Sequence, residues 1–170
     1  MKKYKASFLP LAIFYALIFM GRGAFGYYIG LYYAAIKLSN TEIGIISSIG
    51  SFVGLLGQPL WGGISDRAEN KNRVLYLTLV FTAISIWFLP LSRGSFWLLV
   101  IASAFFGFFE NTVTPLSDSI AIELAHNSGF KFSAIRTIGS VGFAIMSAIA
   151  GKIFSINIYY IFVVFSLLRT

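Results

Sequence analysis

The sequence predicts an all-α membrane protein: a polytopic helical bundle with five complete transmembrane helices and the start of a sixth. Hydrophobic residues make up 58% of the 170-residue chain and charged residues only 11%, whereas charged residues are near a quarter of an average soluble domain. The apolar residues also gather in long runs, and about 20 such residues are enough for a helix to span a bilayer.

The apolar runs divide the chain into six segments. The first follows a basic N-terminus, as in a signal peptide, but it continues well past any cleavage point. The second begins at Ser39-Asn40-Thr41-Glu42, which has the form of a capping box. Glu123, His126 and Lys131 are expected in a solvated loop at or beyond the end of the fourth span. The expected spans are residues 8–36, 39–65, 74–91, 96–124 and 134–155, with a partial sixth at 159–168.

The final run is too short to cross a membrane. It supplies about 10 apolar residues, or roughly 15 Å of helix, against a hydrocarbon core of about 30 Å. We therefore expect residues 1–170 to form one incomplete N-terminal transmembrane bundle, taken from a fragment or a truncated reading frame.

Basic residues in the loops predict the orientation. Seven of them fall on one side of the membrane and three on the other, which places the first side and the N-terminus in the cytoplasm by the positive-inside rule. This reading needs no nucleic acid or acidic partner and implies a multi-pass protein of the plasma membrane. The first group is Lys2, Lys3, Lys5, Arg67, Lys71, Arg73 and Lys131; the second is Lys37, Arg93 and Lys152.

Residues that carry enzyme or metal chemistry are scarce in this sequence. There is no cysteine and one histidine, His126, which cannot build a histidine-based metal site alone. No nucleophile and base are paired in a recognisable motif. We therefore expect neither an enzyme nor a metal or other cofactor.

Four charged residues lie inside the expected spans: Arg22, Glu110, Asp118 and Arg136. Each costs about 2.5 to 3.5 kcal/mol at a helix centre, so a helix that only anchors would be expected to lack them. Their signs balance, which predicts pairs. Such charges usually line a pathway, but they can also hold helices together, and both readings stay open.

Depth in the membrane indicates which charges pair. Arg22 is 14 residues from either end of the first span, and Glu110 is 14 residues from either end of the fourth. Both therefore lie about 21 Å from each helix end and share the midplane. Asp118 and Arg136 differ by about 6 Å in level across a hairpin, which an arginine can bridge. Asn111, Thr114 and Asp118 follow one stripe of the fourth helix.

Two further groups of residues allow more than one reading. The aromatic residues near the outer end of the first span are expected to form an interfacial belt, although some could instead face a cavity and stack a substrate. The glycine pairs Gly50/Gly54 and Gly139/Gly142 are expected to allow close helix packing. The aromatic residues are Phe25, Tyr27, Tyr28, Tyr32 and Tyr33.

The loop after the second span carries a motif. Its residues resemble the loop between the second and third helices of the major facilitator superfamily, with Glu69 at the position that is usually glycine. Charges in such a loop can form an inter-helix ion network, although exposed pairs contribute little each. The motif residues are Gly62, Asp66, Arg67, Lys71 and Arg73.

A second resemblance concerns the fourth and fifth spans. Pro115-Leu116-Ser117-Asp118 and the stretch 135–143 are similar to the lactose-permease and phenylpropionate-permease branch of this superfamily. The resemblance implies that Asp118 and Arg136 hold substrate hydroxyls. Asn111, on the same helix stripe as Asp118, is expected to join them as a substrate-binding residue that lines the pathway. Phe143 stands where lactose permeases have a sugar-stacking tryptophan. Arg22 and Glu110 have no counterpart that the resemblance supplies and are expected to line the pathway.

The resemblance implies a proton-coupled secondary carrier for a small solute such as a sugar, nucleoside or aromatic acid. Its partners would be membrane lipid, the solute, protons and an absent C-terminal transmembrane half. Such carriers contain inverted three-helix repeats, and here the first and fourth spans both carry central charges. The alternative is a truncated membrane remnant or assembly subunit that transports nothing.

Overall fold

The computed structural model describes residues 8–169, so the N-terminal basic cluster of Lys2, Lys3 and Lys5 lies outside the described residues. Among the described residues, five helical segments are long and apolar enough to span a membrane, which confirms the predicted fold class. The helices are α1 Phe8–Phe25, α2 Ile29–Ala35, α3 Asn40–Arg67, α4 Lys71–Ser85, α5 Phe88–Leu91, α6 Phe96–Ser128, α7 Phe132–Ile156 and α8 Tyr160–Arg169.

The helix ends follow local chemistry. At the start of α3 the capping box is present: Glu42 accepts a hydrogen bond from the Ser39 amide at 2.8 Å, and the Ser39 hydroxyl accepts one from the Glu42 amide. At the end of α6, Gly129 adopts a left-handed conformation with φ of 81°, which glycine takes without steric cost.

The predicted loops were too long at two places. We expected the fourth span to end at residue 124, but α6 continues to Ser128, so Glu123 and His126 lie on the helix and not in a loop. Polarity marks the membrane boundary, whereas the helix itself ends where Gly129 permits the turn. The charged loop expected at 66–73 is likewise only residues 68–70, because α3 and α4 extend into it.

Two expected spans are interrupted. The first breaks at residues 26–28 between α1 and α2, where the amide of Tyr28 donates to the carbonyl of Phe25 in a turn. Gly21 and Gly23 precede this break and Gly26 lies in it, and glycine is a weak helix former. The third span breaks between α4 and α5, just before Pro90.

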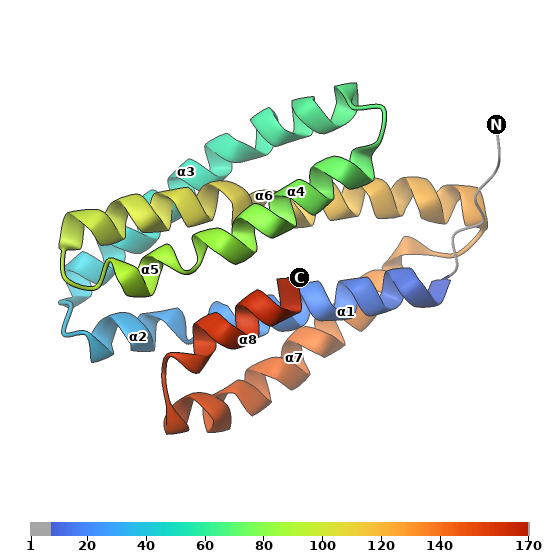
Figure 1. Cartoon of the computed structure of the whole chain (residues 1–170). Helices are drawn as coiled ribbons and strands as arrows, with labels where there is room; N and C mark the ends of the chain where they lie inside the picture. Colours follow the sequence, from blue (N-terminus) through green and yellow to red (C-terminus); the bar gives the residue numbers. More distant parts are fainter. Residues whose placement is uncertain (1–7, 170) are drawn as a thin grey trace.

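The helices form two groups (Figure 1). α3 and α4 pack on α6, whereas α7 and α8 pack on α1, and α4 contacts α8 between the groups. The first span, which contains α1, packs on the fifth, α7, and the fourth span, α6, packs on the second, α3. The two helix pairs are therefore related by a shift of three spans. α1 and α6 have little close backbone contact within the described chain. Long side chains bridge the space between them.

Glycines bring α3 and α6 into close contact, as predicted. A Cβ at Gly107 would lie 2.1 Å from the carbonyl oxygen of Gly50, and one at Gly54 would lie 2.0 Å from the Asn111 amide nitrogen. On the other side of the bundle, a Cβ at Gly142 would lie 2.9 Å from the Ala16 carbonyl oxygen. These contacts exclude side chains and let the helices approach closely.

Large apolar side chains cover the outside of the bundle. Leu9, Leu55, Leu91 and Trp97 are each more than half exposed. An apolar surface of this extent is unfavourable in water but suits the hydrocarbon core of a bilayer. The chain is a multi-pass membrane protein.

We predict that Gly107→Ala destabilises the bundle, because the added methyl group would collide with the Gly50 carbonyl. Overpacking of this kind typically costs about 1–3 kcal/mol. Thermal unfolding followed by circular dichroism in detergent micelles would show a lower melting temperature. Gly63→Ala is the control, because no described atom lies within 4 Å of its added Cβ. Equal melting temperatures for the two variants would contradict the prediction.

Candidate functional site

Three charged side chains meet at the centre of the bundle, and we call Arg22, Glu110 and Arg169 the central triad. Arg169 donates a hydrogen bond from Nη2 to Oε1 of Glu110, and the Arg22 Nε lies 3.4 Å from the same oxygen. Glu110 and Arg169 are 7% and 3% exposed. One carboxylate therefore joins α1 and α8 to α6.

The predicted Arg22–Glu110 ion pair is confirmed, but sequence reasoning missed Arg169. The last run was considered only for its apolar length, and no depth in the membrane was assigned to Arg169, which follows it. α8 starts at the same end of the bundle as α6, and Arg169 is nine residues after Tyr160. At 1.5 Å per residue it reaches about half of a 30 Å core. Counting helix rise per residue, as for Arg22, would have placed Arg169 near the midplane.

The central triad has unused hydrogen-bonding capacity. Among the residues that the structure describes, Glu110 Oε2 and the Nε and Nη1 atoms of Arg169 are buried and lack a hydrogen-bond partner. An unpaired buried polar group is costly. The triad is thus a strongly polar point in an otherwise apolar bundle.

The second pair, Asp118 with Arg136, is also present and joins α6 to α7. Nη1 of Arg136 donates to Oδ2 of Asp118, while the Tyr15 hydroxyl donates to Oδ1 at 2.8 Å. The Arg136 guanidinium lies 5.0 Å from the ring centroid of Phe19, which is within range of a cation–π contact. Tyr15 and Phe19 come from α1 and were not predicted.

The Asp118–Arg136 pair is accessible. Its side chains are 26% and 40% exposed, far more than those of Glu110 and Arg169. A carboxylate beside a guanidinium can accept and donate hydrogen bonds to the same hydroxylated solute. The pair is therefore partly buried and can still form hydrogen bonds with a bound solute.

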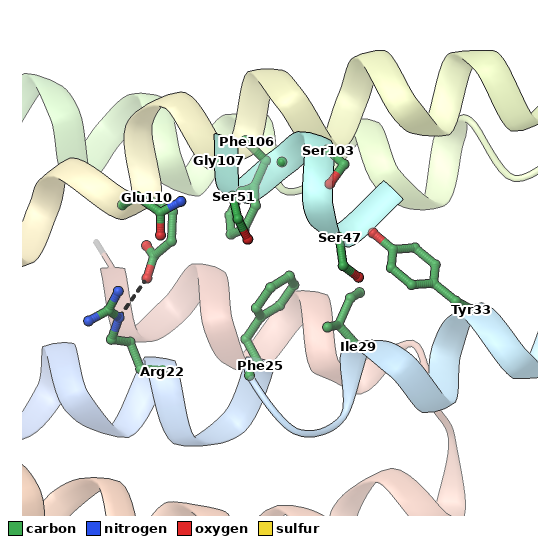
Figure 2. A pocket seen from close by; sticks show the side chains of 13 residues that line it. Arg22, Phe25, Ile29, Tyr33, Ser47, Ser51, Ser103, Phe106, Gly107 and Glu110 are labelled. Atoms are coloured by element: carbon green, nitrogen blue, oxygen red, sulfur yellow. Dashed lines mark ion pairs between the residues drawn. The ribbon is translucent and has the colours of Figure 1, made fainter. Parts of the chain in front are cut away.

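A half-open cavity of about 300 Å³ lies between α1 and α2 on one side and α3 and α6 on the other. Figure 2 shows Arg22 and Glu110 at one end, Tyr33 at the other and Phe25 between them. Asn111, predicted as a substrate-binding residue, lines this cavity and is not part of the Asp118–Arg136 site. Pro115 also removes the amide that would pair with the Asn111 carbonyl in a regular helix.

Comparison with known proteins identifies the family. A family model described as the MFS_1 like family matches residues 8–169. The chain belongs to the major facilitator superfamily. It corresponds to the N-terminal part of a transporter of this superfamily.

Relatives in this superfamily include named permeases. The chain is 35% identical to a maltose permease of Geobacillus stearothermophilus, covering 78% of the chain and 34% of the relative. It is 28% identical to a lactose permease of Citrobacter freundii, covering 74% and 32%. It is 29% identical to the "Probable 3-phenylpropionic acid transporter" of Escherichia coli, covering 84% and 38%. The chain spans about a third of the length of these relatives.

Phe143, the predicted stacking residue, lies near Arg22. It lines a cavity of about 390 Å³ together with Phe19, Arg22 and Ser140. Its ring meets that of Tyr27 edge to face, with centroids 5.8 Å apart. Phe19 links the Asp118–Arg136 pair to the cavity beside Arg22, because it lines this cavity and its ring lies beneath the Arg136 guanidinium.

The aromatic belt predicted for the first span is wrong for most of its members. Only Tyr27 is well exposed, at 68%, whereas Tyr32 and Tyr33 are buried in the core. Tyr28 donates a hydrogen bond to the Ser147 carbonyl on α7 at 2.7 Å, and Phe25 lines the 300 Å³ cavity. The turn between α1 and α2 directs these side chains inward.

The superfamily loop motif lies at the exposed end of α3 and the start of α4. Gly62, Asp66 and Arg67 lie on the last turns of α3, while Lys71 and Arg73 lie on the first turn of α4. Within the described residues, the ion pair at this loop joins Lys71 to Glu123 of α6 at 3.0 Å. The predicted inter-helix contact therefore uses Glu123 instead of Asp66.

We predict that Glu110→Met destabilises the bundle by about 3–5 kcal/mol, because it leaves the buried Arg169 without its partner. Adding Arg169→Met should recover most of the loss. Chemical unfolding in detergent micelles measures both effects. The exposed pair Lys71–Glu123 is the control, and its double replacement by methionine should cost less than about 1 kcal/mol. A double variant no more stable than Glu110→Met would refute the prediction.

Proposed function

We propose that the chain forms the N-terminal helical bundle of a secondary active carrier that moves a small organic solute by alternating access. The observation that carries the proposal is the partly exposed Asp118–Arg136 pair between α6 and α7, in a chain of this superfamily. A structural ion pair has no need of exposure, whereas a binding site does.

In this proposal the two charges share the work of recognition. Asp118 accepts hydrogen bonds from solute hydroxyl groups, and Arg136 donates to solute oxygens. The Tyr15 hydroxyl keeps one Asp118 oxygen in place at 2.8 Å. Asn111 and Phe143 line the route, and Phe143 offers an aromatic face for a sugar or aromatic ring. Arg22 and Glu110 lie further along the same pathway.

The proposed substrate is a small polar or aromatic solute of the size of a sugar, a nucleoside or an aromatic acid. The relatives named for maltose, lactose and 3-phenylpropionic acid support this range. Their solutes share hydrogen-bonding oxygens next to an apolar ring face. A carboxylate–guanidinium pair beside Phe19 and Tyr15 suits that combination.

Alternating access needs a second bundle that rocks against this one. We propose that a second set of transmembrane helices, together with lipid, covers the exposed apolar faces of α3 and α7, which include Leu55, Leu56 and Ile145. The basic residues at the α3–α4 and α6–α7 connections support a plasma-membrane orientation with the N-terminus in the cytoplasm. The proposed driving force is the proton gradient, as the likeness to lactose permeases implies.

Uptake by the complete carrier in cells tests this function with radiolabelled maltose, lactose and 3-phenylpropionate. We predict that Asp118→Asn lowers uptake by at least about tenfold at equal expression, because it removes a charged hydrogen-bond partner. Glu69→Gln is the matched control, since it removes an exposed carboxylate that lies in the α3–α4 loop. Dissipating the proton gradient should abolish accumulation. Unchanged uptake in Asp118→Asn would exclude the proposed role.

A further inference from the structure

The charges inside the bundle do not balance. Among the described residues, three arginines and two carboxylates face its interior: Arg22, Arg136 and Arg169 against Glu110 and Asp118. Asp118 and Arg136 neutralise each other. The central triad is left with two guanidinium groups, one carboxylate and one net positive charge.

Arg22 is the less tightly paired arginine of the triad. Arg169 has a completely buried side chain and makes the shorter contact with Glu110, whereas Arg22 reaches the same carboxylate oxygen only at 3.4 Å through its Nε. The Arg22 side chain is 33% exposed. It also lines both neighbouring cavities. Arg22 is therefore the arginine of the triad that a ligand can reach.

The 300 Å³ cavity beside Arg22 has the lining of a ligand site. Its walls combine the aromatic rings of Phe25 and Phe106 with the hydroxyl groups of Ser47 and Ser51. Figure 2 shows Phe25 between Arg22 and Ser47, with Ser51 across the cavity from Phe25. Arg22, Glu110 and Asn111 also line the cavity, so it offers charged, polar and aromatic groups together. Its volume is near the lower limit for small-molecule pockets.

We propose that this cavity binds a small organic monoanion, with its carboxylate on Arg22 and its apolar body against Phe25 and Phe106. The anion supplies the negative charge that the central triad lacks, and a guanidinium binds a carboxylate through paired hydrogen bonds. The inference rests on the proposed carrier function and narrows its substrate class to organic acids.

Replacing Glu110 distinguishes an anion-binding triad from a purely structural one, because the two predict different changes in anion affinity. Its carboxylate competes with the ligand for Arg22, so Glu110→Gln should strengthen binding of an anion in protein that folds. Arg22→Gln should weaken it at least tenfold. The second variant is expected to fold, because Glu110 keeps its bond to Arg169.

Ligand-induced thermal stabilisation of the purified chain in micelles tests the proposal. The probes are 3-phenylpropionate and its neutral analogue 3-phenylpropan-1-ol. We expect the carboxylate alone to raise the melting temperature, Arg22→Gln to abolish the shift and Arg22→Lys to retain part of it. Lys152→Gln, which removes an exposed cation near the end of α7, should behave as wild type.

Three results would overturn the inference: no shift with 3-phenylpropionate, an equal shift with the alcohol, or an unchanged shift in folded Arg22→Gln. The carrier function is judged separately by uptake of the three labelled solutes and by the effect of Asp118→Asn on that uptake. Maltose uptake that depends on Asp118, without carboxylate binding at Arg22, would remove the inference and leave the proposed function standing. If uptake did not depend on Asp118 and no carboxylate bound at Arg22, both the proposed function and the inference would be excluded.

Discussion

Glu110 joins the two helix groups through one carboxylate oxygen. Arg169 from α8 and Arg22 from α1 both contact it, although α1 and α6 have little close backbone contact. In an apolar interior a charge must be compensated nearby, because the bilayer offers no water to solvate it. This shared contact and the apolar core around Phe106, Phe162 and Phe165 together set the spacing between the groups and the position of α8.

Close packing within each group complements this polar contact between groups. Gly50 and Gly107 bring α3 and α6 together, and Gly142 does the same for α7 and α1. Small residues let helices associate by van der Waals contact where no hydrophobic effect acts between them. The groups are tightly packed internally and joined by long side chains, an arrangement that leaves room for a cavity between them.

The sequence predicted the span number, the capping box and both ion pairs inside the spans, because apolar run length and helix rise fix depth in a membrane. It did not predict Arg169, which ends a run too short to count as a span. Tyr15 was also missed, since a tyrosine within an apolar run carries no periodic signal. The inward turn of Tyr32 and Tyr33 depends on the break between α1 and α2. Gly21, Gly23 and Gly26 are a local signal that could have indicated this break.

The order of the triad along the chain has a consequence for biogenesis. Synthesis proceeds from the N-terminus, so Arg22 emerges from the ribosome long before Glu110, and Arg169 emerges last of the three. An arginine at the middle of a helix is costly to insert without a partner. The span that contains Arg22 therefore gains its compensating charge only when α6 is inserted, and Arg169 reaches the same carboxylate after that. Membrane integration of the first helix is completed by segments made much later.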